Sequence, residues 1–284
     1  MHTIAFRSLT ARLLLLIAML AVGSVQAQNV AITQCQGKCP AYTSDLAATR
    51  SNIVVHHVFA AGLNANSGEA DWVAYRMTKE AVGVASLLPR IWQPDELMPF
   101  SLGGEEVLEL ESTVISLSEI SSTPNPYGGF NALPTEQDDR ARLAPMTSFA
   151  NTPYWTDLNK LSNMVPMPAP LRTGAWLLLE QALNQLVSRY GELYVVSGPL
   201  YLINQGLSTS LDNADFGPAA YFKVVVSDDE LAAFVFPENL GQHVHYCQQL
   251  GKVEQIEQMS GLELFPGRSL HESTNLLADL GCTR

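Results

Sequence analysis

Alternating apolar and polar positions predict several β-strands along this chain. In residues 71–80, DWVAYRMTKE, one set of alternate side chains is apolar and the other is mixed, which is the period-two pattern of a strand. A further strand signal covers residues 52–63, and a weaker one covers residues 105–112. Continuous apolar runs, which are typical of strands in a core, cover residues 192–201, 219–228 and 231–239.

One long helix is predicted from Leu171 or Arg172 to about Tyr190. Apolar side chains recur there at helical spacing, and Gly191 suits the end of the helix. Two short helices, each closed by a glycine, are predicted at residues 253–261 and 273–281. Strands dominate, with one long helix packed on them, so we expect an α+β fold.

The first 27 residues have the pattern of a secretory signal. A cationic start precedes an apolar core at residues 13–22, and Val25, Gln26 and Ala27 form a small-residue cleavage site. A membrane anchor is the alternative, but the apolar run is too short to span a bilayer comfortably. We therefore expect a mature chain of residues 28–284 that is secreted or periplasmic and not membrane-bound. Residues 118–138 are rich in Ser, Thr, Pro, Asn and Gly, which indicates a long surface loop.

The composition is that of a compact globular protein with an acidic surface. Hydrophobic residues make up 47% and charged residues 15%, and the formal net charge is -12. Removal of the signal deletes Arg7 and Arg12, which lowers Lys+Arg from 16 to 14 against 28 acids and brings the net charge to -14. Phosphate contacts dominate non-specific nucleic-acid affinity, so this balance argues against tight binding of DNA or RNA outside a local basic cleft.

Four cysteines follow the signal, an even number in an oxidising compartment. Three disulfide pairings are open from the sequence. The spacing of Cys35 and Cys39 is also compatible with a metal or redox site. No histidine or second close cysteine pair lies nearby, which favours a structural disulfide.

The heptapeptide DRARLAP at residues 139–145 resembles the D-R-G-H-x-A-P signature of the DNA/RNA non-specific endonucleases, which are secreted ββα-metal nucleases. YWTDLNKLSNMVP at residues 154–166 and LRTGAWLLLE at residues 171–180 continue the same family pattern. The resemblance implies one endonuclease-like domain at residues 28–284 with a central antiparallel sheet. It also implies a Mg²⁺ cofactor, a homodimer, and the disulfides Cys35–Cys39 and Cys247–Cys282.

Two arginines occupy the positions where this family carries its central chemical groups. The last signature residue is the general-base histidine in the family pattern, and it is Arg142 here. The asparagine that ligates magnesium is Arg172 here. Guanidinium stays protonated and has no acceptor lone pair, and Mg²⁺ requires oxygen ligands. The resemblance therefore implies that the base and the metal ligand are both replaced.

The other site positions of the family pattern are retained. Arg140 matches the signature arginine and Arg90 a second arginine near the scissile phosphate, whereas Asn163 matches an asparagine beside the metal shell. Glu180 matches the helix glutamate that holds a metal-bound water. Eight residues separate Glu180 from Arg172, which places them on roughly the same face of a helix and predicts an ion pair between them.

Three functions follow from these patterns. The first is a secreted pseudonuclease that keeps the fold and retains binding of phosphate, DNA, RNA or a protein partner. The second is a working magnesium endonuclease with replacement groups. His56, His57, His243, His245 and His271 are candidates for the base, although a structural or surface role is favoured for each. The third is a protein-interaction or immunity-like module in which the cleft has no role.

Overall fold

The computed structural model describes residues 32–44, 51–64, 68–97, 140–201 and 217–282, all of them within a single compact unit, Ile32–Arg284. The expected signal, the weak strand at residues 105–112 and the polar loop at residues 118–138 lie outside the described residues. Among the described residues, no helix has both the length and the apolar character needed to cross a membrane.

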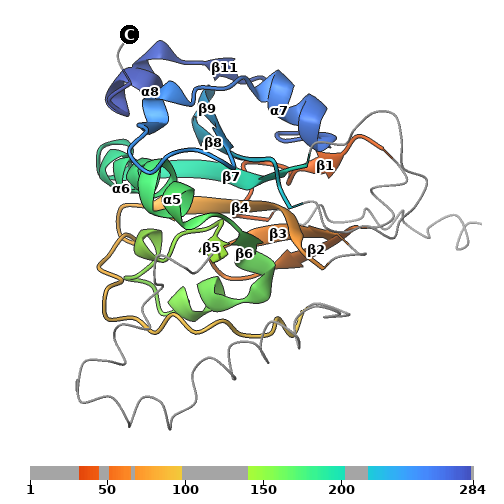
Figure 1. Ribbon diagram of the computed structural model, residues 1–284, viewed down its shortest axis with the longest axis vertical. Coiled ribbons are helices and arrows are strands. Elements are labelled where there is room, and N and C mark those ends of the chain that lie inside the picture. Colours follow the sequence, from red (N-terminus) through yellow and green to blue (C-terminus); the bar gives the residue numbers. More distant parts are fainter. Residues whose placement is uncertain (1–31, 45–50, 65–67, 98–139, 202–216, 283–284) are drawn as a thin grey trace, which may run out of the picture. The chain divides into compact units, whose positions relative to one another are not determined.

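A seven-stranded sheet forms the centre of the unit, in the order β11-β9-β8-β7-β4-β3-β2 (Figure 1). Every neighbouring pair is antiparallel except β11 and β9, which run parallel, so the sheet is mixed at one edge. The bounds are β2 Ser51–Val55, β3 Ala60–Asn64, β4 Ala70–Thr78, β7 Glu192–Leu200, β8 Ala220–Ser227, β9 Glu230–Pro237 and β11 His271–Glu272.

The strands predicted from residues 71–80, 192–201, 219–228 and 231–239 are confirmed as β4, β7, β8 and β9. The signal at residues 52–63 is divided into two strands, because the chain turns between His56 and Phe59. The amide of His56 donates to the carbonyl of Phe59 at 2.8 Å, and β2 then pairs with β3. The two histidines at the turn, His56 and His57, are the only polar residues between the two apolar stretches, so the sequence did not mark the turn strongly.

The sheet buries side chains on both faces. In β4, Val73 and Tyr75 belong to the core that includes Leu179 of the long helix, whereas Trp72 packs on the other face with Ile256. Trp72 also explains one glycine: a Cβ on Gly62 would lie 2.1 Å from the indole nitrogen. This close approach of backbone and ring is open only to glycine.

A second, two-stranded sheet joins β5 (Arg140–Arg142) and β6 (Met164–Pro166), and a long helical stretch follows it. The stretch comprises α5 (Ala169–Leu171), a π-helical turn η5 (Arg172–Trp176) and α6 (Leu177–Tyr190). Gly174 departs from helical geometry with φ -98 and ψ -119. The predicted helix is thus confirmed, but it is interrupted at its start. α6 packs on β4 and β7 (Figure 1).

Short elements complete the fold. The predicted peripheral helices are α7 (Val253–Ser260) and α8 (Thr274–Asp279), and β1 (Ala41–Tyr42) pairs with β10 (Leu262–Glu263). The 3-10 turns are η2 Met146–Ser148, η3 Trp155–Asn159, η4 Leu161–Asn163 and η6 Tyr246–Gln248.

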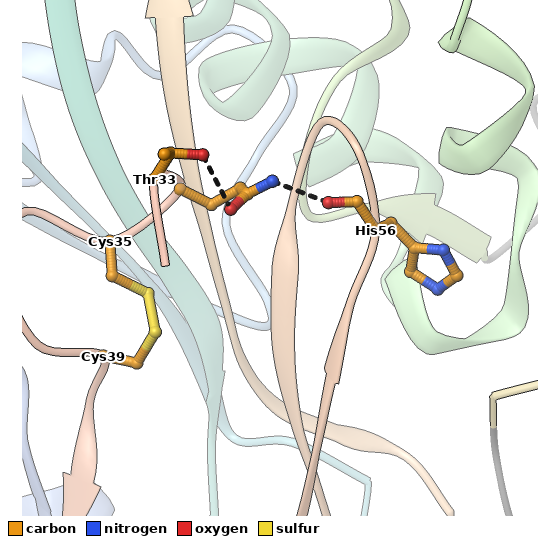
Figure 2. Close-up of a disulfide and its surroundings, with 5 residues drawn as sticks. Thr33, Cys35, Cys39 and His56 are labelled. Atoms are coloured by element: carbon orange, nitrogen blue, oxygen red, sulfur yellow. Dashed lines mark hydrogen bonds between the residues drawn. A yellow bond between two sulfur atoms is a disulfide. The ribbon is translucent and has the colours of Figure 1, made fainter. Parts of the chain in front are cut away.

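Both implied disulfides are present. Cys35 pairs with Cys39 and Cys247 with Cys282, with Cα–Cα distances of 5.0 and 5.1 Å. Beside the first disulfide, the side chain of Gln34 donates to the carbonyl of His56 at 2.6 Å (Figure 2). The disulfide loop is therefore anchored to the turn between β2 and β3.

Candidate active site

Arg140 and Arg142 lie on the same side of β5, because alternate residues of a strand face the same way. Ala141 between them is buried, whereas both arginines are half-buried. β5 pairs with β6 through Arg140 opposite Pro166 and Arg142 opposite Met164. The two-stranded sheet therefore presents two cations, one residue apart, at the start of the helical stretch.

The guanidinium of Arg142 is held by the protein on two of its nitrogens. Nε donates to the carbonyl of Leu158 at 3.2 Å, and Nη2 donates to Oδ1 of Asn159 at 2.6 Å. The guanidinium carbon also lies 4.2 Å from the centre of the Trp92 ring, a cation–π contact. These contacts hold the side chain in place, and the hydrogen bonds connect β5 with the 3-10 turn η3.

Asn159 is also hydrogen-bonded to the segment that contains Arg90. Asn159 is buried, and its Nδ2 donates to the carbonyl of Pro89 at 3.1 Å. Its own carbonyl accepts from the amide of Gln93 at 2.9 Å. Arg90 itself is exposed. One hydrogen-bond network therefore connects the signature strand with the residues on both sides of the second predicted arginine.

Asn163 has no exposed surface, and its side chain makes hydrogen bonds to backbone groups. Its Oδ1 accepts from the amide of Ala144 at 2.8 Å, and its Nδ2 donates to the carbonyls of Ala144 and Leu158, each at 3.0 Å. Because the amide oxygen already accepts a backbone hydrogen, this side chain holds the end of the signature in place.

Glu180 pairs with a residue that the sequence pattern did not single out. Its Oε1 lies 3.0 Å from Nζ of Lys223 on β8, and this is its ion pair among the described residues. The prediction of an ion pair with Arg172 was therefore wrong. The reason is the kink at Gly174, between Arg172 and Glu180, because it breaks the helical spacing on which the prediction relied.

Burial dominates the electrostatics of this pair. It raises the pKa of Glu180, while the charge and hydrogen bond of Lys223 and the charge of Arg142 act in the opposite direction. Burial also lowers the pKa of Lys223, against the effect of Glu180. Lys223 lies 4.0 Å from the centre of the Trp176 ring. A lysine inside the apolar run of residues 219–228 was the sequence signal for this pair, because a charge in a buried strand requires a partner.

Arg172 begins the π-helical turn. Its amide donates to the carbonyl of Pro168 at 3.0 Å, and its side chain is half-buried. A Cβ on Gly174, in the same turn, would lie 2.4 Å from the carbonyl oxygen of Gln242. The turn is thus packed closely against the segment before η6, and this packing fixes the position of the backbone at Arg172.

Three of the five candidate histidines, His56, His57 and His271, lie within ion-pair distance of an aspartate. His56 Nε2 lies 2.8 Å from Oδ2 of Asp95, which also accepts from Ser162. Burial alone would raise the pKa of Asp95, but the hydrogen bonds from His56, Ser162 and the amide of Leu97 outweigh it and lower the pKa.

His57 forms a more exposed pair with Asp157. Its Nδ1 lies 3.1 Å from Oδ2 of Asp157, and its ring stacks on Tyr154 with 4.0 Å between centroids. The His57 side chain is 62% exposed. Asp157 thus contacts Nδ1, one of the two nitrogens of the ring. Of the remaining histidines, His245 accepts from the amide of Cys247, and His271 in β11 lies 3.9 Å from Oδ2 of Asp229. His243 is exposed.

The α+β fold thus contains a short antiparallel strand pair followed directly by a helix, with arginines on the first strand and a buried carboxylate on the helix. The sequence model of the DNA/RNA non-specific endonucleases matches residues 40–269. The chain belongs to this family.

The relatives agree with this assignment. The chain is 30% identical over 287 residues to a nuclease of Serratia marcescens, covering 95% of this chain and 97% of that protein. It is 26% identical over 178 residues to a nuclease of a Nostoc strain, covering 61% of this chain and 54% of that protein. A chain in the crystal structure of the EndoG/EndoGI complex has the same fold, with a TM-score of 0.55 and 20% identity over 78% of this chain and 89% of that one.

Proposed function

We propose that this protein is a secreted pseudonuclease: an endonuclease-family protein with strongly impaired catalysis that keeps weak binding of phosphate groups or nucleic acid. The observation that carries the proposal is the state of Arg142, which is held through Nε and Nη2 by Leu158 and Asn159. In the family pattern this position carries the general base. A guanidinium that is permanently protonated and already engaged with protein oxygens cannot take a proton from water.

The residues around Arg142 also do not fit a magnesium ion. Arg172 stands at the position of the family's ligand and brings a positive charge instead of an oxygen. The carboxylate of Glu180 is paired with Lys223 through Oε1, and the amide oxygen of Asn163 already accepts from the amide of Ala144. Loss of a positioned base alone lowers a rate by about 10²–10⁴-fold, and the loss of metal stabilisation adds to it.

Residual anion binding is supported by the cations that remain. Arg140 and Arg142 share one side of β5, and Arg90 lies on the segment tied to Asn159. Arginine binds oxyanions well because its planar fork matches their geometry. The net charge of -14 expected for the mature chain opposes a polyanion elsewhere on the surface, so we expect binding to be weak and confined to this region.

The test uses the mature chain, residues 28–284, incubated with plasmid and with RNA, with Mg²⁺ or with EDTA. We expect no cleavage above that of a mock purification. We expect a short oligonucleotide to bind without Mg²⁺ and more weakly at high salt. Arg140→Gln should weaken this binding, whereas Arg189→Gln, which removes an exposed arginine paired with Asp279, should not. EDTA-sensitive cleavage that follows the protein through purification contradicts the proposal.

A second candidate function is an active endonuclease with a replacement base, and the geometry of His57 favours it. Asp157 orients the ring through Nδ1, as a partner does for a catalytic histidine, and most of the side chain is exposed. If cleavage is found, His57→Ala should abolish it, whereas His271→Ala should leave it unchanged. Retained cleavage in His57→Ala excludes this base.

The interaction-module alternative is supported by apolar side chains beside Arg90. Val84, Leu87 and Ile91 are 80%, 86% and 67% exposed. Exposed apolar side chains mark a partner-binding surface where they form one contiguous patch, which is the premise of this alternative. This function replaces the first if the protein binds no anion and its partner binding is lost in Leu87→Ser but kept in Arg140→Gln.

A further inference from the structure

His57 and Tyr154 form a parallel pair of rings at the surface of the protein. Their centroids lie 4.0 Å apart and their planes differ by 3°. The His57 side chain is 62% exposed and Tyr154 is 44% exposed. In each of the other ring pairs found in the described part of the chain, at least one ring is buried. Each ring of this pair covers one face of the other, so the exposed surface lies on the outer faces and the edges.

The ring of His57 is held in one orientation by its neighbours. The amide of His57 donates to Oδ2 of Asp157 at 3.1 Å, and the ring Nδ1 lies 3.1 Å from the same oxygen. The carbonyl of His57 accepts from Nε2 of Gln34 at 3.0 Å. Tyr154 and Asp157 belong to one turn, because the amide of Asp157 donates to the carbonyl of Tyr154 at 3.0 Å. A ring that is fixed in this way loses little conformational entropy when a ligand stacks on it.

The ring pair is connected to the proposed phosphate-binding region through the 3-10 turn η3. In this turn Asp157 contacts His57, whereas the next two residues, Leu158 and Asn159, accept hydrogen bonds from Arg142. Adjacent Cα atoms are about 3.8 Å apart, so consecutive residues of one turn contact the ring pair and the signature arginine. A single strand of nucleic acid is long enough to contact both.

We propose that the ring pair of His57 and Tyr154 is a stacking site for an unpaired nucleobase. An aromatic face stacks on a base of any sequence, because every base has a π-face. Bases inside a duplex already stack on their neighbours, so such a site favours single-stranded DNA or RNA. The proposal rests on the proposed function, to which it adds the class of nucleic acid: the arginines bind phosphate, and the ring pair binds a base.

Adenosine tests the stacking alone, because it has a base but no phosphate. In NMR spectra of the mature protein, we expect adenosine to shift the ring signals of His57 upfield through the ring current of the stacked base. The ring signals of His271, an exposed histidine outside the pair, should not move. His57→Ala and His271→Ala assign the two sets of signals, and ribose, which lacks the base, should shift neither. If adenosine leaves the His57 signals in place, or moves those of His271 equally, the proposal is overturned.

A short oligodeoxyadenylate and an abasic oligomer with the same number of phosphates test the stacking in a nucleic acid. The wild type should bind the first more tightly, with a Kd lower by on the order of 10-fold for one stacked base. His57→Ala combined with Tyr154→Leu should remove this difference. Tyr154→Phe, which keeps the ring, and His271→Ala should retain it. A double variant that still prefers the oligodeoxyadenylate contradicts the stacking site.

The double variant should bind a closed duplex plasmid as tightly as the wild type does, because paired bases do not reach the rings. A loss on the plasmid as large as that on the single strand overturns the proposal. If neither oligomer binds but adenosine shifts the His57 signals, the proposed function fails and the stacking site stands. If both oligomers bind equally and adenosine shifts nothing, the proposed function stands and the stacking site fails.

Discussion

Arg142 and Asn159 are joined by a hydrogen bond of 2.6 Å between Nη2 and Oδ1. Asn159 is buried and passes the connection on to the carbonyl of Pro89 at 3.1 Å. The signature strand and the segment of Arg90 are thus linked through one amide side chain. This relationship makes Arg142 part of the scaffold as well as part of the site.

Asn159→Ala should therefore destabilise the protein by about 1–3 kcal/mol, because it removes two part-buried hydrogen bonds, one to the carbonyl of Pro89 and one from Nη2 of Arg142. Urea unfolding followed by circular dichroism measures the change. Asn151→Ala removes a more exposed hydrogen bond, from Nδ2 to the carbonyl of Val82, and should lower stability by no more than about 1 kcal/mol. Equal effects of the two variants contradict the structural importance of Asn159.

The strands and the long helix could be predicted from the sequence because their signals are local. The alternation in β4 and the apolar runs of β7, β8 and β9 follow directly from the side that each residue presents to the core. The parallel pairing of β11 with β9 was not predictable, since β11 has only two exposed residues.

The site contacts could be predicted less well, because they depend on tertiary packing. The family pattern pointed to Arg142, Asn163 and Glu180 but not to the groups that hold them. Trp92 and Asn159 reach Arg142 from segments far apart in the sequence. The kink at Gly174 also changed the relation of Arg172 to Glu180, and apart from that glycine nothing in residues 171–180 distinguishes the stretch from a regular helix.

Asp95 should contribute to stability in a pH-dependent way. Its pKa in the folded protein is lowered, so its contribution is fully present above the ordinary aspartate pKa of 3.8 and is lost as the pH falls through the lower, folded value. The unfolding free energy of the wild type should therefore fall towards that of Asp95→Asn in acid, below about pH 4. Unfolding by guanidinium chloride at several pH values measures this dependence. If the difference in unfolding free energy between the wild type and Asp95→Asn is the same at every pH, the prediction is wrong.

The two disulfides should differ in their contribution to stability. Cys247 and Cys282 are 35 residues apart, whereas Cys35 and Cys39 are only 4 apart. The chain-entropy model gives about 4 kcal/mol for the longer loop and about 2 kcal/mol for the shorter one. Paired serine substitutions, compared by urea unfolding, test the order. A larger loss from the Cys35 and Cys39 pair reverses it.

The most direct test of whether the two arginines impair catalysis is to replace them with the histidine and the asparagine of the family pattern. Arg142→His combined with Arg172→Asn supplies an imidazole, which can accept a proton near neutral pH, and an amide oxygen, which Mg²⁺ can bind. We expect Mg²⁺ to raise the melting temperature of this variant but not of the wild type. Plasmid cleavage should rise above the wild-type level, up to about the 10²–10⁴-fold that a positioned base contributes.

The matched control is Arg142→Ala combined with Arg172→Ala, which removes the same two charges without adding a base or a ligand. Both double variants lose the hydrogen bond to Asn159 and the contact with Trp92, so both should be less stable than the wild type. Only the His and Asn variant should respond to Mg²⁺. If the two variants behave alike, the two arginines are not the cause of the impairment that we propose.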